Sequence, residues 1–287
     1  MKTFKTFLEA KAGGSAGLVY EPLTAQPAPY YLDKYCQDSF WMLTKKAPLF
    51  RGIQRKGLDV SFVDLTQTTR KSQNTSNWYT EIFDNHPEMQ DFPKRSKSMV
   101  CSNSYDYARG FGDEVYAIFP VKNSKIGLVP ESDIWEISVN LFGKSLDINV
   151  MNKFLAQIII IGLNTDLCTF EILKQFGDQI KHEDGEVYQR IKNSRYSGLL
   201  DNGEFVNNFL GAILEAYSPD KLGLKTFTPA TLSTAYSPYH EHEVWFDTGA
   251  IVIPLNKWHE MVSAYKKSNR DIRSWQDLLE VMKNENI

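Results

Sequence analysis

Residues 236–246 read YSPYHEHEVWF, and this stretch decides how the chain is interpreted. A Ser-Pro turn signal leads into alternating and then apolar residues, which predicts a loop entering a strand. In a strand, residues i and i+2 point to one side about 7 Å apart, so Glu241 and Glu243 would share a face opposite His240 and His242. One carboxylate could then stabilise a developing cation and the other hold an attacking group. The alternative is that the two glutamates are only a solvated pair on an exposed strand face. The choice between these interpretations depends on other segments of the chain.

The composition is that of a globular protein. The chain has 287 residues, 42% of them hydrophobic, which fits one large domain or two small ones. A formal net charge of -3 argues against broad nonspecific nucleic-acid binding. Three scattered cysteines without a Cys-x-x-Cys motif favour a reducing, cytosolic setting. The most apolar run, residues 158–163, is far too short to cross a bilayer, so no membrane partner is expected.

The order of apolar patterns predicts a mixed α+β fold. Residues 1–17 form an amphipathic stretch that runs into a Gly-rich segment, and we expect a flexible leader there. Short apolar runs predict buried strands, and 3.6-residue spacing predicts helices. The strands are expected at 48–53, 99–101, 115–120, 126–130 and 250–254, and the helices at 31–46, within a helical stretch at 148–217 (150–163, 170–180 and 205–217), at 257–267 and at 274–283.

Two further segments carry candidate polar groups. Arg51 stands between apolar neighbours on the first predicted strand, where a planar guanidinium would suit a phosphate or a carboxylate. An arginine extending from a strand edge to solvent is the alternative interpretation. Ser102 and Ser104 end the strand that begins at Met99, and Ser104 also suits the N-cap of a helix closed at Gly112. Capping explains Ser104 fully and Ser102 less well.

In chain order the three segments give an arginine on a strand, Ser-x-Ser before a helix, and Glu-x-Glu opening a late strand. This set resembles the arginine–serine–glutamate class of ADP-ribosyltransferases, typified by cholera-toxin-like and clostridial C2- and C3-like toxins, which also includes tailed-phage enzymes. The matching residues are 49–52, 100–104 with Ala108 and Gly112, and 241–246. The leader at 1–17 is also similar in composition to those of tailed-phage proteins that are packaged into the virion.

The resemblance implies two small, mostly antiparallel sheets packed around an NAD cleft, with N-terminal helices, a helical insertion and C-terminal helices. Residues 18–287 would form one catalytic domain carrying the insertion at about 148–217. Asn103 departs from the family pattern, which usually has Thr there. The long separation between the serine and glutamate motifs is the second departure, and it leaves the acceptor unassigned.

The implied activity is that of a mono-ADP-ribosyltransferase, a glycosyltransferase that uses NAD as substrate and releases nicotinamide. Glu243 would stabilise the cationic ribose of an oxocarbenium-like transition state. Arg51 would hold the pyrophosphate or the adjacent ribose, and Ser102 would bond inside the nicotinamide pocket and position Glu243. Gly52 would keep backbone groups accessible to the nicotinamide amide, and Ser104 belongs to the same NAD-binding set.

The resemblance also implies an acceptor and a location. In the family, a glutamate at the position of Glu241 accompanies arginine acceptors, so an arginine of a host protein is expected, with Tyr236 or Tyr239 touching the target. A nucleic-acid acceptor stays open. The site of action would be the host cytoplasm, with delivery by a virion as one route.

Four other functions compete with transfer. A metal site is not expected, because histidines and glutamates would point to opposite strand faces and no His-Glu-x-x-His spacing exists. A serine hydrolase is disfavoured because no Gly-x-Ser-x-Gly elbow is present. A non-catalytic virion or injected structural protein and an NAD glycohydrolase remain as alternatives.

Overall fold

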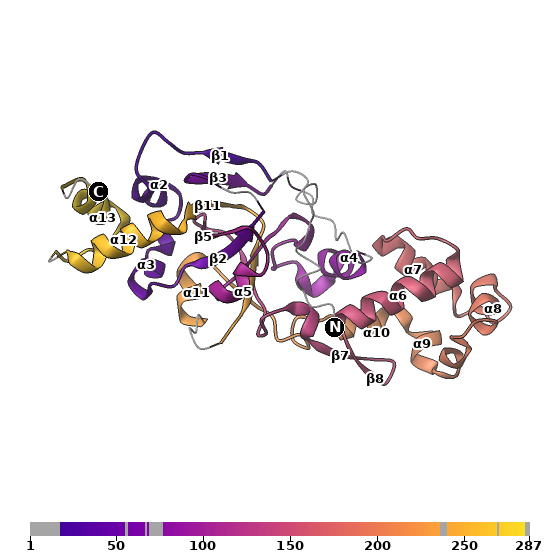
Figure 1. Cartoon of the computed structure of the whole chain (residues 1–287). Coiled ribbons are helices and arrows are strands. Elements are labelled where there is room, and N and C mark those ends of the chain that lie inside the picture. Colours follow the sequence, from indigo (N-terminus) through magenta and orange to yellow (C-terminus); the bar gives the residue numbers. More distant parts are fainter. Residues whose placement is uncertain are drawn as a thin grey trace. The chain divides into compact units, whose positions relative to one another are not determined.

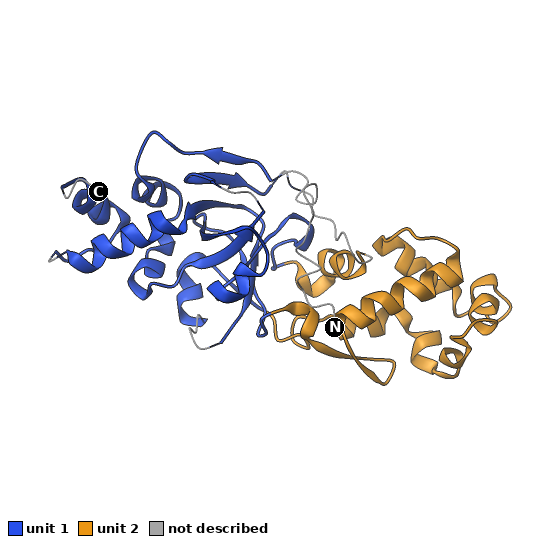
Figure 2. Cartoon of the chain, in the orientation of Figure 1, with its two compact units in different colours: residues 1–70, 91–132, 225–287 blue, residues 71–90, 133–224 orange. Residues whose placement is uncertain are grey.

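The computed structural model describes residues 18–54, 57–66, 68, 77–235, 240–268 and 270–284. The leader expected at 1–17 and the two turn residues Tyr236 and Tyr239 lie outside these ranges. The chain divides into two compact units (Figure 2). Unit 1 takes the described residues within 1–70, 91–132 and 225–287, and unit 2 takes those within 71–90 and 133–224.

A nine-stranded sheet forms the centre of unit 1 (Figure 1). Its strand order is β1-β3-β11-β5-β2-β4-β10-β6-β9, and each described pairing is antiparallel. The predicted α+β class is therefore confirmed. The strands are β1 Tyr20–Pro22, β2 Leu49–Ile53, β3 Ser61–Asp64, β4 Met99–Ser102, β5 Glu114–Pro120, β6 Ile126–Leu128, β9 Lys225–Phe227, β10 Glu243–Phe246 and β11 Gly249–Pro254.

The sheet consists of two halves that meet at β2 and β4. Within the halves the ladders are long: β2 pairs β5 from Leu49 to Ile53, and β10 pairs β4 from Glu243 to Phe246. Between the halves the ladder holds the single pair Phe50↔Ser102. The two small sheets expected from the resemblance are therefore replaced by one nine-stranded sheet, whose two halves are joined by this single described pair.

Helices pack on the half-sheet formed by β1, β3, β11, β5 and β2, and they close the core of unit 1. Helices α2 and α12 contact β11, and α13 contacts both α2 and α12. The core between them includes Leu32, Ile118, Ile251, Trp258 and Trp275. The helical segments of unit 1 are α2 Ala28–Tyr35, η1 Gln37–Ser39, α3 Trp41–Lys45, η3 Arg95–Lys97, α5 Tyr105–Arg109, α11 Pro229–Ala235, α12 Leu255–Lys267 and α13 Trp275–Asn284.

The single helix predicted at 31–46 is wrong, because the chain breaks at Cys36 into α2, η1 and α3. The Cys36 thiol donates to the carbonyl of Phe119 at 3.3 Å, and the Cys36 carbonyl accepts from the Trp275 indole at 3.1 Å. These contacts across long sequence separations replace local helical ones. The two C-terminal helices are confirmed, with Ser274 accepting from the backbone N–H of Asp277 at 3.1 Å as an N-cap.

Unit 2 is mostly helical. It contains α4 Trp78–Asn85, η2 Pro87–Met89, η4 Ile134–Glu136, α6 Ile148–Leu163, α7 Phe170–Gln179, α8 Glu186–Lys192, η5 Ser197–Asp201, α9 Gly203–Asn207 and α10 Phe209–Ala216, with the hairpin β7 Ser138–Leu141 and β8 Lys144–Asp147. The helical stretch expected at about 148–217 lies inside this unit, which also includes α4 and the hairpin.

Side-chain caps define where two helices of unit 2 begin, and a cluster of aromatic rings packs in its interior. Asp147 caps α6 by accepting from Val150 N at 2.6 Å, and Thr169 caps α7 by accepting from Ile172 N at 3.3 Å. The rings of Phe142, Phe176, Phe205 and Phe209 pack together at centroid distances from 4.7 to 6.2 Å. None of the helices in the described ranges is long and apolar enough to cross a membrane.

Candidate active site

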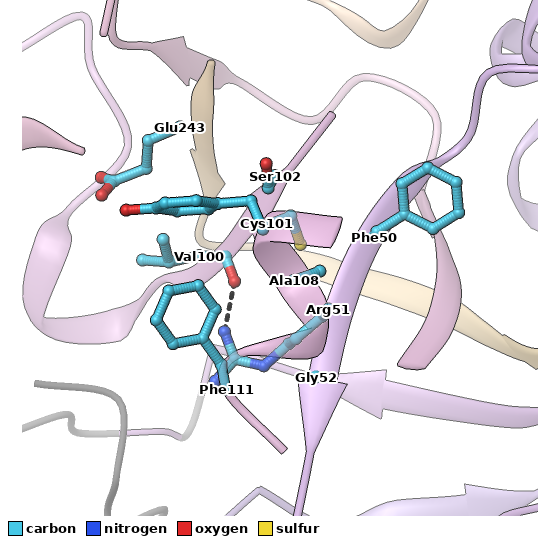
Figure 3. A pocket seen from close by; sticks show the side chains of 10 residues that line it. Phe50, Arg51, Gly52, Val100, Cys101, Ser102, Ala108, Phe111 and Glu243 are labelled. Atoms are coloured by element: carbon cyan, nitrogen blue, oxygen red, sulfur yellow. Dashed lines mark hydrogen bonds between the residues drawn. The ribbon is translucent and has the colours of Figure 1, made fainter. Parts of the chain in front are cut away.

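Three polar residues from three neighbouring strands of unit 1 lie at the junction of the half-sheets. Arg51 lies in the middle of β2, Ser102 ends β4, and Glu243 begins β10. The register places Ser102 between its partners, opposite Phe50 on one side and Glu243 on the other. Adjacent strands lie about 5 Å apart, so three segments far apart in sequence become neighbours. All three predicted residues line one pocket (Figure 3).

The rest of the pocket wall is mainly apolar and aromatic. Phe50 on β2 and Tyr107 and Phe111 from α5 and its C-terminal end line it, together with Val100 and Ala108. Figure 3 shows Phe50 and Phe111 among the labelled side chains around the pocket. An apolar cavity with a few polar groups is the usual form of a small-molecule site. The aromatic walls suit a flat ring.

Arg51 is half-buried and carries its charge without an ion pair among the described residues. Its Nη1 donates a short hydrogen bond to the carbonyl oxygen of Val100, drawn as the dashed line in Figure 3. The carbonyl fixes the direction of the guanidinium but does not neutralise it. The remaining N–H groups of an arginine form a planar fork, so the side chain can bind an anion in the pocket.

Glu243 is buried, with 1% of its surface exposed, and its Oε1 accepts from Nη1 of Arg95 at 2.7 Å. Arg95 begins the short helix η3 and is also 1% exposed, and its guanidinium carbon lies 4.9 Å from the ring centroid of Trp245. The second carboxylate oxygen of Glu243, Oε2, is buried and has no hydrogen-bond partner in the described part of the chain. The carboxylate is therefore anchored through one oxygen only.

Residues alternate along β10 between the site and the core. Val244 and Phe246 belong to the apolar core, whereas Glu243 and Trp245 point to the opposite face. The Trp245 indole is fixed by its N–H bond to the Pro93 carbonyl at 3.0 Å. It also covers Gly127, where an added Cβ would collide with the indole ring. The tryptophan thus forms a fixed surface beside the Arg95–Glu243 pair.

Ser102 and Ser104 connect the pocket to the exposed edge of the site. Ser102 is 4% exposed and its Oγ accepts from the backbone N–H of Ser104 at 3.0 Å. Ser104 caps α5 by accepting from Tyr107 N at 3.2 Å, as predicted. Its Oγ also donates to Oε1 of Glu241 at 2.7 Å, so the cap residue holds the first carboxylate of the Glu-x-Glu motif. Ser104 and Glu241 are not among the pocket-lining residues.

The prediction that Glu241 and Glu243 share one strand face is wrong, because the strand begins only at Glu243. Glu241 is exposed. Asn103 holds the segment before the strand: its Oδ1 accepts from His242 N at 2.7 Å and its Nδ2 donates to His240 O at 2.7 Å. The backbone N–H of Asn103 also donates to His242 O at 3.3 Å, so the amide side chain adds two bonds to one that the backbone already makes.

Gly52 has a packing role visible in the structure. A Cβ there would collide with the Ala108 carbonyl and lie 2.7 Å from Gly112 N, and a Cβ on Gly112 would collide with the backbone of Ile53. The two glycines let the end of α5 contact β2 directly. Gly52 also lines the pocket, so the backbone access predicted for it stays a prediction.

Cys101 also lines the pocket, and burial raises the pKa of its thiol to about 12. The Arg51 charge acts in the opposite direction, but burial outweighs it. A thiol with this pKa is protonated at neutral pH, and the nucleophile in cysteine chemistry is the thiolate. The Cys101 thiol is therefore a poor candidate for a nucleophile in this pocket.

Sequence reasoning missed two residues of the site, Arg95 and Asn103. Arg95 stands in the polar run Arg95-Ser96-Lys97-Ser98, which is typical of a solvated loop. Its one signal is its place directly before a buried strand. In the sequence, Asn103 stands out only as a departure from the family pattern. Its amide can donate and accept at once, which a threonine hydroxyl does less well across two backbone groups.

Among the described residues, no group of three or more His, Cys, Asp and Glu side chains is arranged to hold a metal ion. Comparisons of the chain with models of protein families, with curated proteins and with solved structures found no match.

Proposed function

We propose that the chain is a mono-ADP-ribosyltransferase that moves ADP-ribose from NAD to an acceptor and releases nicotinamide. The observation that carries the proposal is the buried Oε2 of Glu243, which has no hydrogen-bond partner among the described residues, on a residue that lines a pocket together with Arg51 and Ser102. A buried carboxylate oxygen without a hydrogen bond is costly in free energy. Such a group points to a functional use, here the stabilisation of positive charge on a substrate.

The reaction begins with cleavage of the bond between ribose C1′ and the nicotinamide nitrogen. The bonding electrons leave with nicotinamide, and the ribose becomes an oxocarbenium-like cation, as in glycoside hydrolysis. A preorganised carboxylate at Glu243 stabilises this cation in a water-poor site, where charge interactions are strong. No proton needs to move in this step.

The enclosed space of the pocket is about 10 Å³, far below the range of about 300–1,000 Å³ typical for whole ligands, so side chains must move before one part of a dinucleotide can enter. Once these side chains move apart, the flat nicotinamide would lie against the aromatic walls formed by Phe50, Tyr107 and Phe111. Ser102 supplies a hydroxyl to the carboxamide side. Arg51, with its uncompensated charge, binds the pyrophosphate or the adjacent ribose.

The acceptor side of the proposal rests on Glu241. It is exposed, yet its carboxylate is held by Ser104 only two residues before Glu243. The acceptor nitrogen attacks C1′ to form the new C–N bond, and its proton passes to the Glu241 carboxylate. An arginine side chain of a host protein suits this arrangement because its guanidinium pairs with a carboxylate through two parallel hydrogen bonds. The host cytoplasm is the setting that this acceptor implies.

Incubation of the full chain with labelled NAD and a bacterial lysate tests the proposal. The expected result is release of nicotinamide and a protein carrying one ADP-ribose on arginine, located by mass spectrometry. Label on nucleic acid would change the acceptor class but keep the transfer. Release of nicotinamide and free ADP-ribose alone would indicate a glycohydrolase. No consumption of NAD would overturn the proposal and favour a non-catalytic virion or injected protein.

A further inference from the structure

A second arginine, Arg95, lies behind the proposed site. It lines no part of the pocket, yet it bonds Oε1 of Glu243 at 2.7 Å with both side chains fully buried. It stands four positions before Met99, the first residue of β4, and β4 is the strand that carries Ser102. One short segment thus supplies both a pocket hydroxyl and the cation behind the carboxylate.

A buried ion pair is weak evidence for a role in stability. Replacing such a pair with apolar residues of similar size is often neutral or stabilising, because desolvation of both charges offsets their attraction. The face of β10 that holds Glu243 also holds Trp245, so an apolar filling would be physically natural there. The arginine is therefore better explained by what it does to the carboxylate.

The geometry around Arg95 fixes direction as well as charge. The guanidinium carbon lies 4.9 Å from the centroid of the Trp245 ring, and the indole is itself fixed by Pro93. The planar cation thus has a preset position and contacts one oxygen of Glu243. The other oxygen, Oε2, has no partner among the residues the structure describes.

We propose that Arg95 is a positioning residue that holds Glu243 through Oε1, so that Oε2 faces the ribose of bound NAD. The proposal rests on the proposed function. Arg95 touches neither substrate nor acceptor, and it acts on the turnover step through Glu243 alone. It offsets the cost of burying the carboxylate charge and keeps that carboxylate in one orientation.

The test compares Arg95→Met and Arg95→Lys with the wild-type chain in the hydrolysis of NAD without an acceptor. Misplacing a catalytic group by about 1 Å lowers a rate on the order of a hundredfold, so we expect kcat to fall about a hundredfold in Arg95→Met. Arg95→Lys keeps the charge but not the planar group, and should recover about tenfold of this loss. The KM for NAD should stay within about threefold, because Arg95 does not reach the pocket. Arg270→Met, which removes an exposed arginine, is the matched control and should keep the wild-type kcat.

Thermal unfolding of each variant separates loss of fold from loss of position. A folded Arg95→Met variant with the wild-type kcat, or with a raised KM and an unchanged kcat, overturns the positioning role. If Arg95→Met does not fold, Arg95→Lys decides by the same two readouts. If neither folds, Trp245→Phe decides, since it removes the indole bond to Pro93 and reduces the aromatic surface beside the guanidinium. A wild-type chain that consumes no NAD refutes the proposed function itself, which is a different result from an active wild type with equally active variants.

Discussion

The floor and the rim of the proposed site place two glutamates, two residues apart, in opposite environments. The floor, defined as Glu243, Arg95 and Trp245, is buried and bonded by a charged group at 2.7 Å. The rim, defined as Glu241, Ser104 and Asn103, is accessible and bonded by neutral groups at the same distance. Equal distances therefore conceal unequal energies, because a charge pair in a buried site is screened far less than a contact at the surface.

The largest expected difference between floor and rim is in stability. Arg95→Met leaves the Glu243 carboxylate buried without its cation and should lower the free energy of unfolding by about 3–5 kcal/mol. The double variant Arg95→Met/Glu243→Leu should regain most of this loss, because no buried charge remains. Urea unfolding measures both.

Lys257→Met is the matched control for that experiment, since Lys257 pairs with Asp59 at 3.4 Å on the surface of the same unit. Its cost should be about 0–1 kcal/mol. Equal losses for Arg95→Met and Lys257→Met would mean that the floor pair is solvated in solution, and the contrast between floor and rim would disappear.

The next effect is catalytic and concerns Glu243→Gln. Removing the charge that stabilises the ribose cation should lower both NAD hydrolysis and transfer by about 10²–10³-fold, with nearly unchanged NAD binding. The variant also leaves Arg95 buried without its anion, so the assay must run well below its unfolding temperature. Glu280→Gln on the exposed face of α13 is the control. Full activity in a folded Glu243→Gln variant would remove the floor from the mechanism.

Arg51→Ala should have a smaller effect, confined to substrate binding. Hydrogen bonds to charged groups contribute about 1.5–3 kcal/mol, so the KM for NAD should rise by about tenfold or more. Arg51→Lys should restore part of the affinity, because it keeps the charge but loses the planar fork. The measurement is steady-state kinetics over a range of NAD concentrations, with Arg109→Ala as the surface control. An unchanged KM would contradict an anion-binding role.

The residues around the floor differ in how well the sequence predicts them. The sequence predicts Arg51, Ser102 and Glu243, because each stands in a short motif next to a clear strand pattern. The register of β2, β4 and β10 then places the three residues around one pocket. Arg95 has only its place before a buried strand as a signal, because its burial depends on a glutamate 148 residues away. The break in the helix at Cys36 has the same cause, since its partners Phe119 and Trp275 are also distant in sequence.

The rim was predicted in type but not in geometry. The sequence placed Glu241 at the edge of the site, but alternation alone put it on the same strand face as Glu243. The structure ends β4 at Ser102 and lets the Asn103 amide hold residues 240–242 instead. A side chain that imitates a strand partner leaves no periodic signal, so the pattern could not reveal it.

The smallest expected effect is the most informative about the rim. If Glu241 accepts the proton of the acceptor, Glu241→Gln should lower transfer by about tenfold and leave NAD hydrolysis within about twofold, since water needs less help to attack a cation. Ser104→Ala should give a weaker change in the same direction, because it frees the carboxylate without removing it and costs about 1 kcal/mol as a lost helix cap. Transfer and hydrolysis are measured in the same reaction from the labelled products. An equal loss of both would place Glu241 with the floor, where it would act on the ribose and not on the acceptor.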